Sequence, residues 1–275
     1  MKTLDNQTLL YDVDCPLCRV YTKGFVAAKM LDQNGKKPYC EITVDEQKYV
    51  DVNRAANQIA LIDNVNKTVT YGIDSLLKII GHSFPWVAKV GNLKLINFFL
   101  RKLYSLISYN RKVIIPSKTK TEFNLQCVPD FNYKYRIIYI LFASTTAILV
   151  SYHFSNLILT SPKSIMISEV IMVLGQIIFQ GLFIIKFSKQ ILLNYVGNLM
   201  TVSLMGSLLL MPILIFNIFF YIPEIIIVGW FGLTILAMLF EHSRRVTILK
   251  LPSYLSITWA VYMLIAVTIT LKIKS

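Results

Sequence analysis

The hydrophobic and polar positions divide the chain into two parts with different patterns. Up to Arg136, short apolar runs alternate with charged and turn-forming residues, which is typical of a soluble α/β domain. A helix needs about 20 apolar residues to cross about 30 Å of hydrocarbon. Beyond Arg136, charge-free apolar stretches follow one another at residues 137–162, 170–185, 190–223, 225–240 and 251–271. We therefore predict an all-α transmembrane bundle of about five helices over residues 137–275, in which the second and fourth helices include a few flanking residues.

The first part of the chain contains shorter elements. The predicted elements are a strand at 8–11, a helix opened by Pro16, a strand at 39–44, a charged helix at 45–56, a hairpin of strands at 58–62 and 68–73, and a helix capped by Asp74 that runs to residue 80. The helix opened by Pro16 has one broad apolar face, and polar turn formers separate the strands of the hairpin. The order β-α-β-α-β-β-α predicts an α/β domain with a thioredoxin-like fold.

Charge and composition support this division. The chain has 28 Lys and Arg against 15 Asp and Glu, a net charge of +13, and 55% hydrophobic residues. Residues 1–136 hold 20 basic and 12 acidic residues, while residues 137–275 hold 8 and 3. Basic residues at the cytoplasmic edges of membrane spans account for the positive balance. We therefore expect the lipid bilayer as a partner, and no nucleic acid.

The distribution of basic residues predicts the topology. With five spans, one side of the membrane collects Lys118, Lys120, Lys134, Arg136, Lys186, Lys189, Arg244, Arg245 and Lys250, and the other collects Lys163, Lys272 and Lys274. Cytoplasmic loops are enriched in Lys and Arg, and residues 1–14 contain no apolar run of signal-peptide length. We expect an integral protein of the cell membrane with its N-terminal domain in the cytoplasm. The two C-terminal lysines leave an even number of spans open.

Two cysteines lie at the start of the first predicted helix. Cys15 and Cys18 are three residues apart, and Pro16 between them favours the first turn of a helix. Thiols at this spacing are close enough to form a disulfide, and free backbone N–H groups stabilise a thiolate on the N-terminal one. We predict that Cys15 is the nucleophile and that Cys18 resolves the mixed disulfide.

Three charged neighbours affect the predicted nucleophile. Arg19 stabilises the Cys15 thiolate if its side chain points back toward the sulfur. Asp12 and Asp14 oppose ionisation by like-charge repulsion. The sequence therefore leaves the thiol pKa open.

Two alternatives to redox chemistry start from the same residues. A C-x-x-C pair is also half of a zinc site, which needs two more ligands, and Cys40 and His82 are the candidates in this domain. Asp12 and Asp14 after an apolar strand also fit the opening of haloacid-dehalogenase-type phosphatases, in which the first Asp is the nucleophile. Those enzymes need a later acidic pair to hold Mg²⁺, and the sequence contains no Asp-Asp pair. We favour the redox interpretation and expect neither a metal nor a bound cofactor.

The cysteine motif also resembles a known signature. Residues 11–18, YDVDCPLC, are similar to the opening of the DCC family of thiol-disulfide oxidoreductases, also called DUF393, in which Asp-Gly-x-Cys-x-x-Cys follows a first strand. Val13 stands where that family has Gly. The resemblance implies a thioredoxin-like fold with Cys15 and Cys18 as the catalytic pair.

Later residues extend the resemblance, which covers residues 8 to about 115. Tyr104 and the pair Asn110 and Arg111 are similar to the closing Tyr and Asn-Arg pattern of the family. Residues 58–80 fit its hairpin and helix, although no Pro precedes residue 58, where thioredoxins carry one beside the cysteines.

The predicted organisation is a thioredoxin-like DCC domain at residues 1–117, a juxtamembrane linker at 118–136 and the membrane domain at 137–275. The first functional hypothesis is a membrane-anchored thiol-disulfide oxidoreductase facing the cytoplasm. The alternative is a non-enzymatic binding or assembly protein, or a redox sensor, because five spans exceed what an anchor requires.

Polar residues within the second and third predicted spans are costly to bury in lipid. They are Glu169, Gln176, Gln180, Asn194 and Asn198. Gln176 and Gln180 are one turn apart and share a helix face, as do Asn194 and Asn198. Hydrogen bonding between helices is the interpretation we favour. The alternative is a polar cavity for a quinone, an ion or a lipid headgroup.

Residues 85–107 have apolar positions at helical spacing with Lys94, Arg101 and Lys102 among them and Trp86 at the start. Packing on the predicted sheet is the interpretation we favour. An interfacial helix that ties the domain to the bilayer is the alternative.

Overall fold

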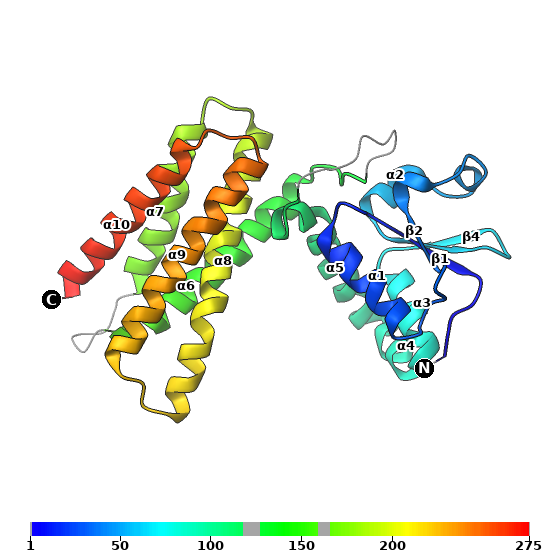
Figure 1. Ribbon diagram of the computed structural model, residues 1–275, viewed down its shortest axis with the longest axis horizontal. Coiled ribbons are helices and arrows are strands. Elements are labelled where there is room, and N and C mark those ends of the chain that lie inside the picture. Colours follow the sequence, from blue (N-terminus) through cyan, green and yellow to red (C-terminus); the bar gives the residue numbers. More distant parts are fainter. Residues whose placement is uncertain (1, 118–126, 159–165, 275) are drawn as a thin grey trace. The chain divides into compact units, whose positions relative to one another are not determined.

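The computed structural model describes residues 2–117, 127–158 and 166–274, and the chain divides into two compact units, Met1–Tyr135 and Arg136–Ser275 (Figure 1). The first unit has a four-stranded mixed sheet with helices, and the second unit is helical. The chain is therefore an α/β domain followed by a helical bundle. Part of the predicted linker, residues 118–126, lies outside the described residues.

The α/β unit contains β1 (Gln7–Tyr11), α1 (Pro16–Ala27), β2 (Lys36–Pro38), η1 (Tyr39–Glu41), η2 (Glu46–Lys48), α2 (Val52–Asn57), β3 (Ala60–Asp63), β4 (Thr68–Tyr71), α3 (Ile73–Ser83), α4 (Pro85–Gly91) and α5 (Lys94–Ile114). The strand order is β2-β1-β3-β4, in which β1 is parallel to β2 and antiparallel to β3, and β3 is antiparallel to β4. The predicted first strand, first helix and hairpin are confirmed.

Both faces of the sheet are covered, because successive residues of a strand point to opposite sides. Leu9 and Leu61 belong to a core on one face, which includes residues of α1 and α3 and Tyr104 from α5. Leu10 and Ile62 belong to a second core on the other face, which includes residues of η1 and α2. The first core brings α5 next to the helix that begins at the cysteine motif.

The predicted strand at residues 39–44 is wrong. The strand β2 ends at Pro38, and a 3-10 turn follows it. Tyr39 and Ile42 are buried in the same core. A spacing of three places side chains on one side of a 3-10 turn, whereas a strand requires an even spacing.

Two predicted helix limits also differ from the structure. Residues 45–56 do not form one helix, because the side chain of Asp51 accepts a hydrogen bond from the backbone N–H of Arg54 at 2.9 Å and starts the separate helix α2. The helix α3 begins after Gly72, whose φ of 65° lies in the left-handed region that favours glycine. Asp74 lies in the first turn of α3 and is not its cap.

The membrane unit contains α6 (Tyr133–Ile158, which begins in the first unit), α7 (Met166–Ile184), α8 (Lys189–Phe219), α9 (Glu224–Ile248) and α10 (Tyr254–Lys274). Within the described residues, the four helices α6 to α9 are long and apolar enough to cross a membrane. They make the chain an integral membrane protein. The apolar segment of α10, Tyr254–Thr268, is shorter than these four helices, so the fifth span stays a prediction. The side of the membrane on which the α/β unit lies also stays a prediction.

The central helix of the bundle is α8, which remains one helix although Pro212 lies within it. Its residues Tyr195 and Leu199 belong to a buried core with Trp259 of α10. A side chain at Gly206 would place its Cβ only 2.3 Å from the sulfur of Met238 on α9. Glycine at this position therefore allows α8 and α9 to approach closely.

Candidate functional site

The strand β1 leads directly into the predicted redox motif. Cys15 is the N-terminal cap of α1 and Pro16 is its first residue, so Cys18 lies on the first turn. The backbone N–H of Cys15 donates to the carbonyl of Asp12 at 3.2 Å and closes the turn between strand and helix. Both cysteines are free thiols, and their exposed fractions are only 2% for Cys15 and 6% for Cys18.

A small cavity with a volume of about 50 Å³ lies beside Cys18. Its polar walls come from β1, α1, η1 and α5, and from single residues that follow β1, α2 and residue 126. The lining residues with polar or sulfur-containing side chains are Tyr11, Asp12, Cys18, Tyr21, Tyr39, Gln58, Tyr104, Ser108, Arg111 and Cys127. Residues that are far apart in the sequence therefore surround one of the two predicted catalytic thiols.

Arg111 provides the positive charge of this cavity. Its buried guanidinium donates hydrogen bonds to the carbonyl oxygens of Ala56 at 3.0 Å and of Cys127 at 2.9 Å. It also lies 3.2 Å from the Cys127 sulfur and 3.4 Å from the carboxylate of Asp12. Burial alone would lower the pKa of Arg111, but the negative groups around it raise the pKa overall. The arginine is therefore a fixed cation.

The two thiols of the motif have different pKa values. The side-chain hydrogen bond with Cys18 lowers the pKa of Cys15 to about 7 against the opposing effect of burial, and the charge of Arg111 contributes further. The same hydrogen bond, together with burial, raises the pKa of Cys18 above its ordinary value. Cys15 therefore ionises first, while Cys18 keeps its proton at neutral pH.

Two tyrosines complete the surroundings of Cys18. The hydroxyl of Tyr104 accepts a hydrogen bond from the backbone N–H of Ile59 at 2.8 Å, and burial raises its pKa to about 12. Tyr21 lines the same cavity as Cys18, and burial together with the neighbouring Cys18 thiol raises the pKa of this tyrosine. Both phenols are neutral at pH 7, so they position their neighbours without adding charge.

Other predicted site residues lie outside this cluster. Arg19 is exposed on α1, and the arginine that lowers the pKa of Cys15 is Arg111. The backbone N–H of Asp14 donates to the carboxylate of Asp12 at 2.9 Å, but the Asp14 side chain does not line the cavity. The expected role of Arg19 therefore falls to Arg111, about ninety residues further along the chain.

Asn110 and Cys127 illustrate what sequence reasoning misses. The side-chain amide of Asn110 donates to the carbonyl oxygens of Leu106 at 2.8 Å and Tyr135 at 3.0 Å, and Asn110 does not line the cavity beside Cys18. Cys127 contacts Arg111 instead, and burial raises its pKa to about 11. No local motif surrounds Cys127, so only the tertiary structure shows its place.

The zinc alternative finds no ligand set in the part of the chain that the structure describes. No group of three or more His, Cys, Asp or Glu side chains is placed there to hold a metal ion. Cys40 and His82 therefore do not join the two motif cysteines in such a group.

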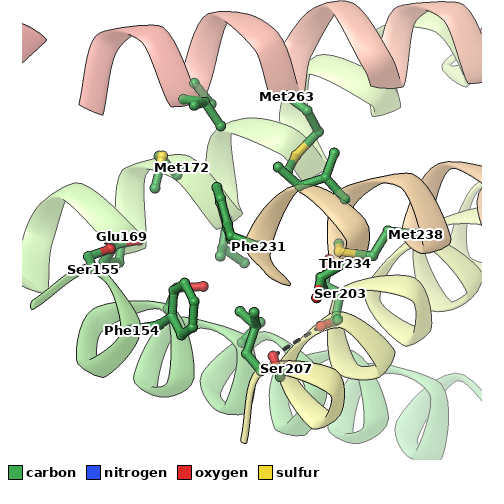
Figure 2. Close-up of a pocket in the computed structure, with 18 of the residues that line it drawn as sticks. Phe154, Ser155, Glu169, Met172, Ser203, Ser207, Phe231, Thr234, Met238 and Met263 are labelled. Carbon is green, nitrogen blue, oxygen red and sulfur yellow. Dashed lines mark hydrogen bonds between the residues drawn. The ribbon is translucent and has the colours of Figure 1, made fainter. Parts of the chain in front are cut away.

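The membrane unit contains a larger cavity of about 150 Å³, lined by residues of all five helices (Figure 2). The side chain of Glu169 is fully buried and accepts a hydrogen bond from the hydroxyl of Ser155 at 2.8 Å. Figure 2 shows this pair at one end of the cavity and Ser203 with Thr234 at the other. The remaining walls are mainly apolar and aromatic. The volume suits a ligand of about the size of benzene.

Hydrogen bonds between the membrane helices are confirmed at four of the predicted polar positions, which are Glu169 described above and Gln176, Gln180 and Asn198. Gln180 of α7 accepts a hydrogen bond from the hydroxyl of Tyr195 on α8 at 2.8 Å. Asn198 of α8 accepts one from the guanidinium of Arg245 on α9 at 2.9 Å. The amide of Gln176 donates to the sulfur of Met263 on α10 at 3.6 Å, and Gln176 also lines the cavity. The structure thus contains both the hydrogen bonds and a cavity.

We compared the chain with known protein families, curated proteins and solved structures. No family model, no curated protein and no solved structure matches the chain. The geometry of the site is therefore the basis for its function.

Proposed function

We propose that the α/β unit is a thiol-disulfide oxidoreductase of thioredoxin-like fold, related to the DCC family, which the helical unit holds at the cytoplasmic face of the membrane. The observation that carries this proposal is the pair of buried free thiols at the N-terminal cap and on the first turn of α1. Cys15, with its pKa lowered to about 7, has the property of an attacking thiol, and Cys18 has that of a protonated resolving thiol.

The order of elements supports the proposed fold. The chain runs β1-α1-β2-α2-β3-β4-α3, in which α1 connects two parallel strands and β3 and β4 form a hairpin. This is the order that the resemblance to the DCC family implies. Two of the later motif residues, Tyr104 and Arg111, line the cavity beside Cys18.

The proposed reaction is a transfer of two electrons from the dithiol to a substrate disulfide. The Cys15 thiolate attacks one substrate sulfur, forms a mixed disulfide and releases the other substrate sulfur as a thiolate. Cys18 then loses its proton and attacks the Cys15 sulfur, which forms the Cys15–Cys18 disulfide and releases the second substrate thiolate. Asp12 lines the same cavity as Cys18, and we assign it the role of accepting that proton.

The cytoplasmic redox poise sets the direction of this reaction. The glutathione pool has a potential of about −220 to −320 mV, depending on the method. A dithiol whose own potential lies above that range rests reduced, so it is ready to reduce substrates. The glutathione pool or another small thiol then returns the disulfide to the dithiol.

Trapping experiments test this function. Cells that produce the full chain with Cys18→Ser are expected to accumulate mixed disulfides on Cys15, because the second step is blocked. Cys15→Ser should trap nothing, and Cys40→Ser, which changes a cysteine outside the motif, should turn over as the wild type does. Mass spectrometry after alkylation should also show the Cys15–Cys18 pair oxidising reversibly across a glutathione redox series. A pair that stays reduced across the whole series would exclude the proposal.

A second candidate function is the binding of a small membrane-soluble ligand in the cavity of Figure 2, which supports the non-enzymatic alternative. A buried carboxyl group at one end of an apolar cavity fits a ring with a polar substituent, such as a quinone head. A short-chain benzoquinone should raise the unfolding temperature of the solubilised full chain, whereas an alkylbenzene of equal length should raise it less. Ser207→Leu, which fills the cavity, should remove the difference. Equal effects of both compounds on the wild type would argue against a specific site.

A further inference from the structure

The helices α4 and α5 expose many large apolar side chains to solvent. These side chains, which together we call the α4–α5 face, are Trp86, Val90, Leu93, Leu95, Phe98, Phe99, Leu103 and Ile107, and all of them are exposed. On α5, residues 95, 99, 103 and 107 recur every fourth position, so they form one stripe along the helix. An apolar surface of this kind on a soluble domain marks an interaction site.

Packing within the domain does not account for this surface. A different side of α5 contacts the domain, because Tyr104 belongs to the core that includes Leu9 and Leu61, and the hydroxyl of Ser108 donates to the carbonyl of Asn57 in α2. Several apolar residues that the sequence pattern predicted to pack on the sheet, among them Leu103 and Ile107, are exposed. The α4–α5 face is an additional apolar side of the same helix. Its side chains therefore require a partner outside the α/β unit.

The charges around the face identify the chemistry of that partner. Lys89, Lys94 and Lys102 lie among its apolar residues and are exposed, and residues 75–121 contain no Asp or Glu. Arg101 is paired with Asp74 at 2.7 Å. A second copy of this chain would bring an equally basic surface, which like-charge repulsion disfavours. Anionic lipid headgroups are complementary to it.

The C-terminal part of α5 contacts the residues that lead into the first membrane helix. The amide of Asn110 bonds to the carbonyl of Tyr135 at 3.0 Å, and the rings of Tyr109 and Tyr135 stack with their centroids 5.2 Å apart. Tyr135 lies in the first turn of α6, which is long and apolar enough to span a bilayer. The C-terminal part of α5 is thus held close to the start of a membrane helix.

We propose that the α4–α5 face docks onto an anionic bilayer surface, with its aromatic and aliphatic side chains at the boundary between headgroups and acyl chains. Trp and Phe at the apolar side and Lys at the polar side are the composition of an interfacial helix. The docked face would fix the α/β unit at the membrane surface. This inference does not depend on the proposed redox function.

Quenching of tryptophan fluorescence by brominated lipids tests the docking directly. The full chain is reconstituted in vesicles of phosphatidylcholine and phosphatidylglycerol in equal parts, with and without bromine on the acyl chains. The contribution of Trp86 is the difference between the wild type and Trp86→Phe, which leaves Trp230 and Trp259 as a constant background. The matched control adds Val65→Trp to Trp86→Phe, because Val65, on the β3–β4 turn, has an exposed fraction of 68% against 67% for Trp86.

We expect brominated lipid to quench Trp86 strongly and the tryptophan introduced in the control not at all. Replacing phosphatidylglycerol by phosphatidylcholine should weaken the quenching of Trp86. The double variant Phe98→Ser with Phe99→Ser should abolish this quenching. Both rings are exposed, so we expect the variant to fold as the wild type does. The check is that buried Cys18 becomes alkylatable at the same temperature in both proteins. Trp86 quenched no more than the control would overturn the proposal, and self-association of the chain through this face without quenching would replace the bilayer by a second copy.

Discussion

The hydrogen bond between the two motif thiols gives the sharpest prediction. Cys18→Ala removes the donor to the Cys15 thiolate, whereas Cys18→Ser keeps a hydroxyl donor at the same position. We expect the pKa of Cys15 to stay near 7 in Cys18→Ser and to rise in Cys18→Ala. The pair of variants separates the hydrogen bond from the charge of Arg111, which both variants retain.

The size of the expected change follows from the pKa itself. The pKa of Cys15 is lowered from an ordinary 9.0 to about 7, which corresponds to ~2.7 kcal/mol at ~1.4 kcal/mol for each unit. A hydrogen bond to an ionised group contributes ~1.5–3 kcal/mol, so its loss should raise the pKa by roughly one to two units. At pH 7 the thiolate fraction would then fall from about one half to as little as ~1%, a decrease of up to ~50-fold. A more basic thiolate is up to ~8-fold more nucleophilic, which leaves a net decrease in rate of up to ~6-fold.

The assay is alkylation of Cys15 by iodoacetamide between pH 5 and 10, measured on the solubilised full chain by mass spectrometry. Cys15 is buried, so every rate includes an opening step, and the midpoint of the pH profile is the quantity to compare. A midpoint near 7 for Cys18→Ala as well as Cys18→Ser would refute the hydrogen bond as the main cause. A midpoint near 9 in the wild type would refute the whole electrostatic description of the site.

Three further predictions concern the cavity and the topology. Arg111→Met should destabilise the α/β unit by ~3–5 kcal/mol, because it leaves the buried carboxylate of Asp12 without its cation. The measurement is the temperature at which Cys18 becomes alkylatable, which should fall. Adding Asp12→Asn should recover part of the lost stability. Tyr104→Phe removes the acceptor for the N–H of Ile59 and should cost ~1–3 kcal/mol by the same measurement. A reporter fused after residue 275 should lie on the side of the membrane opposite the α/β unit, whereas a cytoplasmic signal would mean an even number of spans.

The sequence predicted the elements whose signal is local. The strand before the cysteine motif, the helix opened by Pro16 and the hairpin all follow from spacing and turn residues within short windows. The segment after Pro38 failed, because Tyr39 and Ile42 enter the core with a spacing of three that resembles a strand by composition alone. Local β propensity was overridden there by packing.

In the candidate site, too, the residues with a local signal were predicted and those placed by tertiary packing were not. Cys15 and Cys18 could be identified from their spacing and from the helix that follows them. Arg111 and Cys127 could not be given a role near them, because only the folding of α5 against the sheet brings the arginine to the cavity. The sequence pattern instead pointed to Arg19, which is adjacent along the chain but exposed.

In the membrane unit, composition predicted the long helices but not their contacts. Four helices have the length and hydropathy of spans in the described residues. The hydrogen bonds at Gln180 and Asn198 followed from the cost of burying amides in lipid. A polar cavity was the alternative interpretation of the same residues, but which side chains line it depends on how the five helices pack.

Two consecutive residues of α5 contact the thiol site on one side and the first turn of α6 on the other. Arg111 bonds inward, to Asp12 and to the carbonyl of Cys127, whereas Asn110 bonds to the carbonyl of Tyr135 at the start of α6. Residues one position apart on a helix face different directions, so the last turns of α5 contact both regions at once. If the α4–α5 face docks as we propose, a displacement of α5 would therefore move the guanidinium whose charge helps to lower the pKa of Cys15. The reactivity of the thiol pair and the docking of the α4–α5 face depend on the same helix.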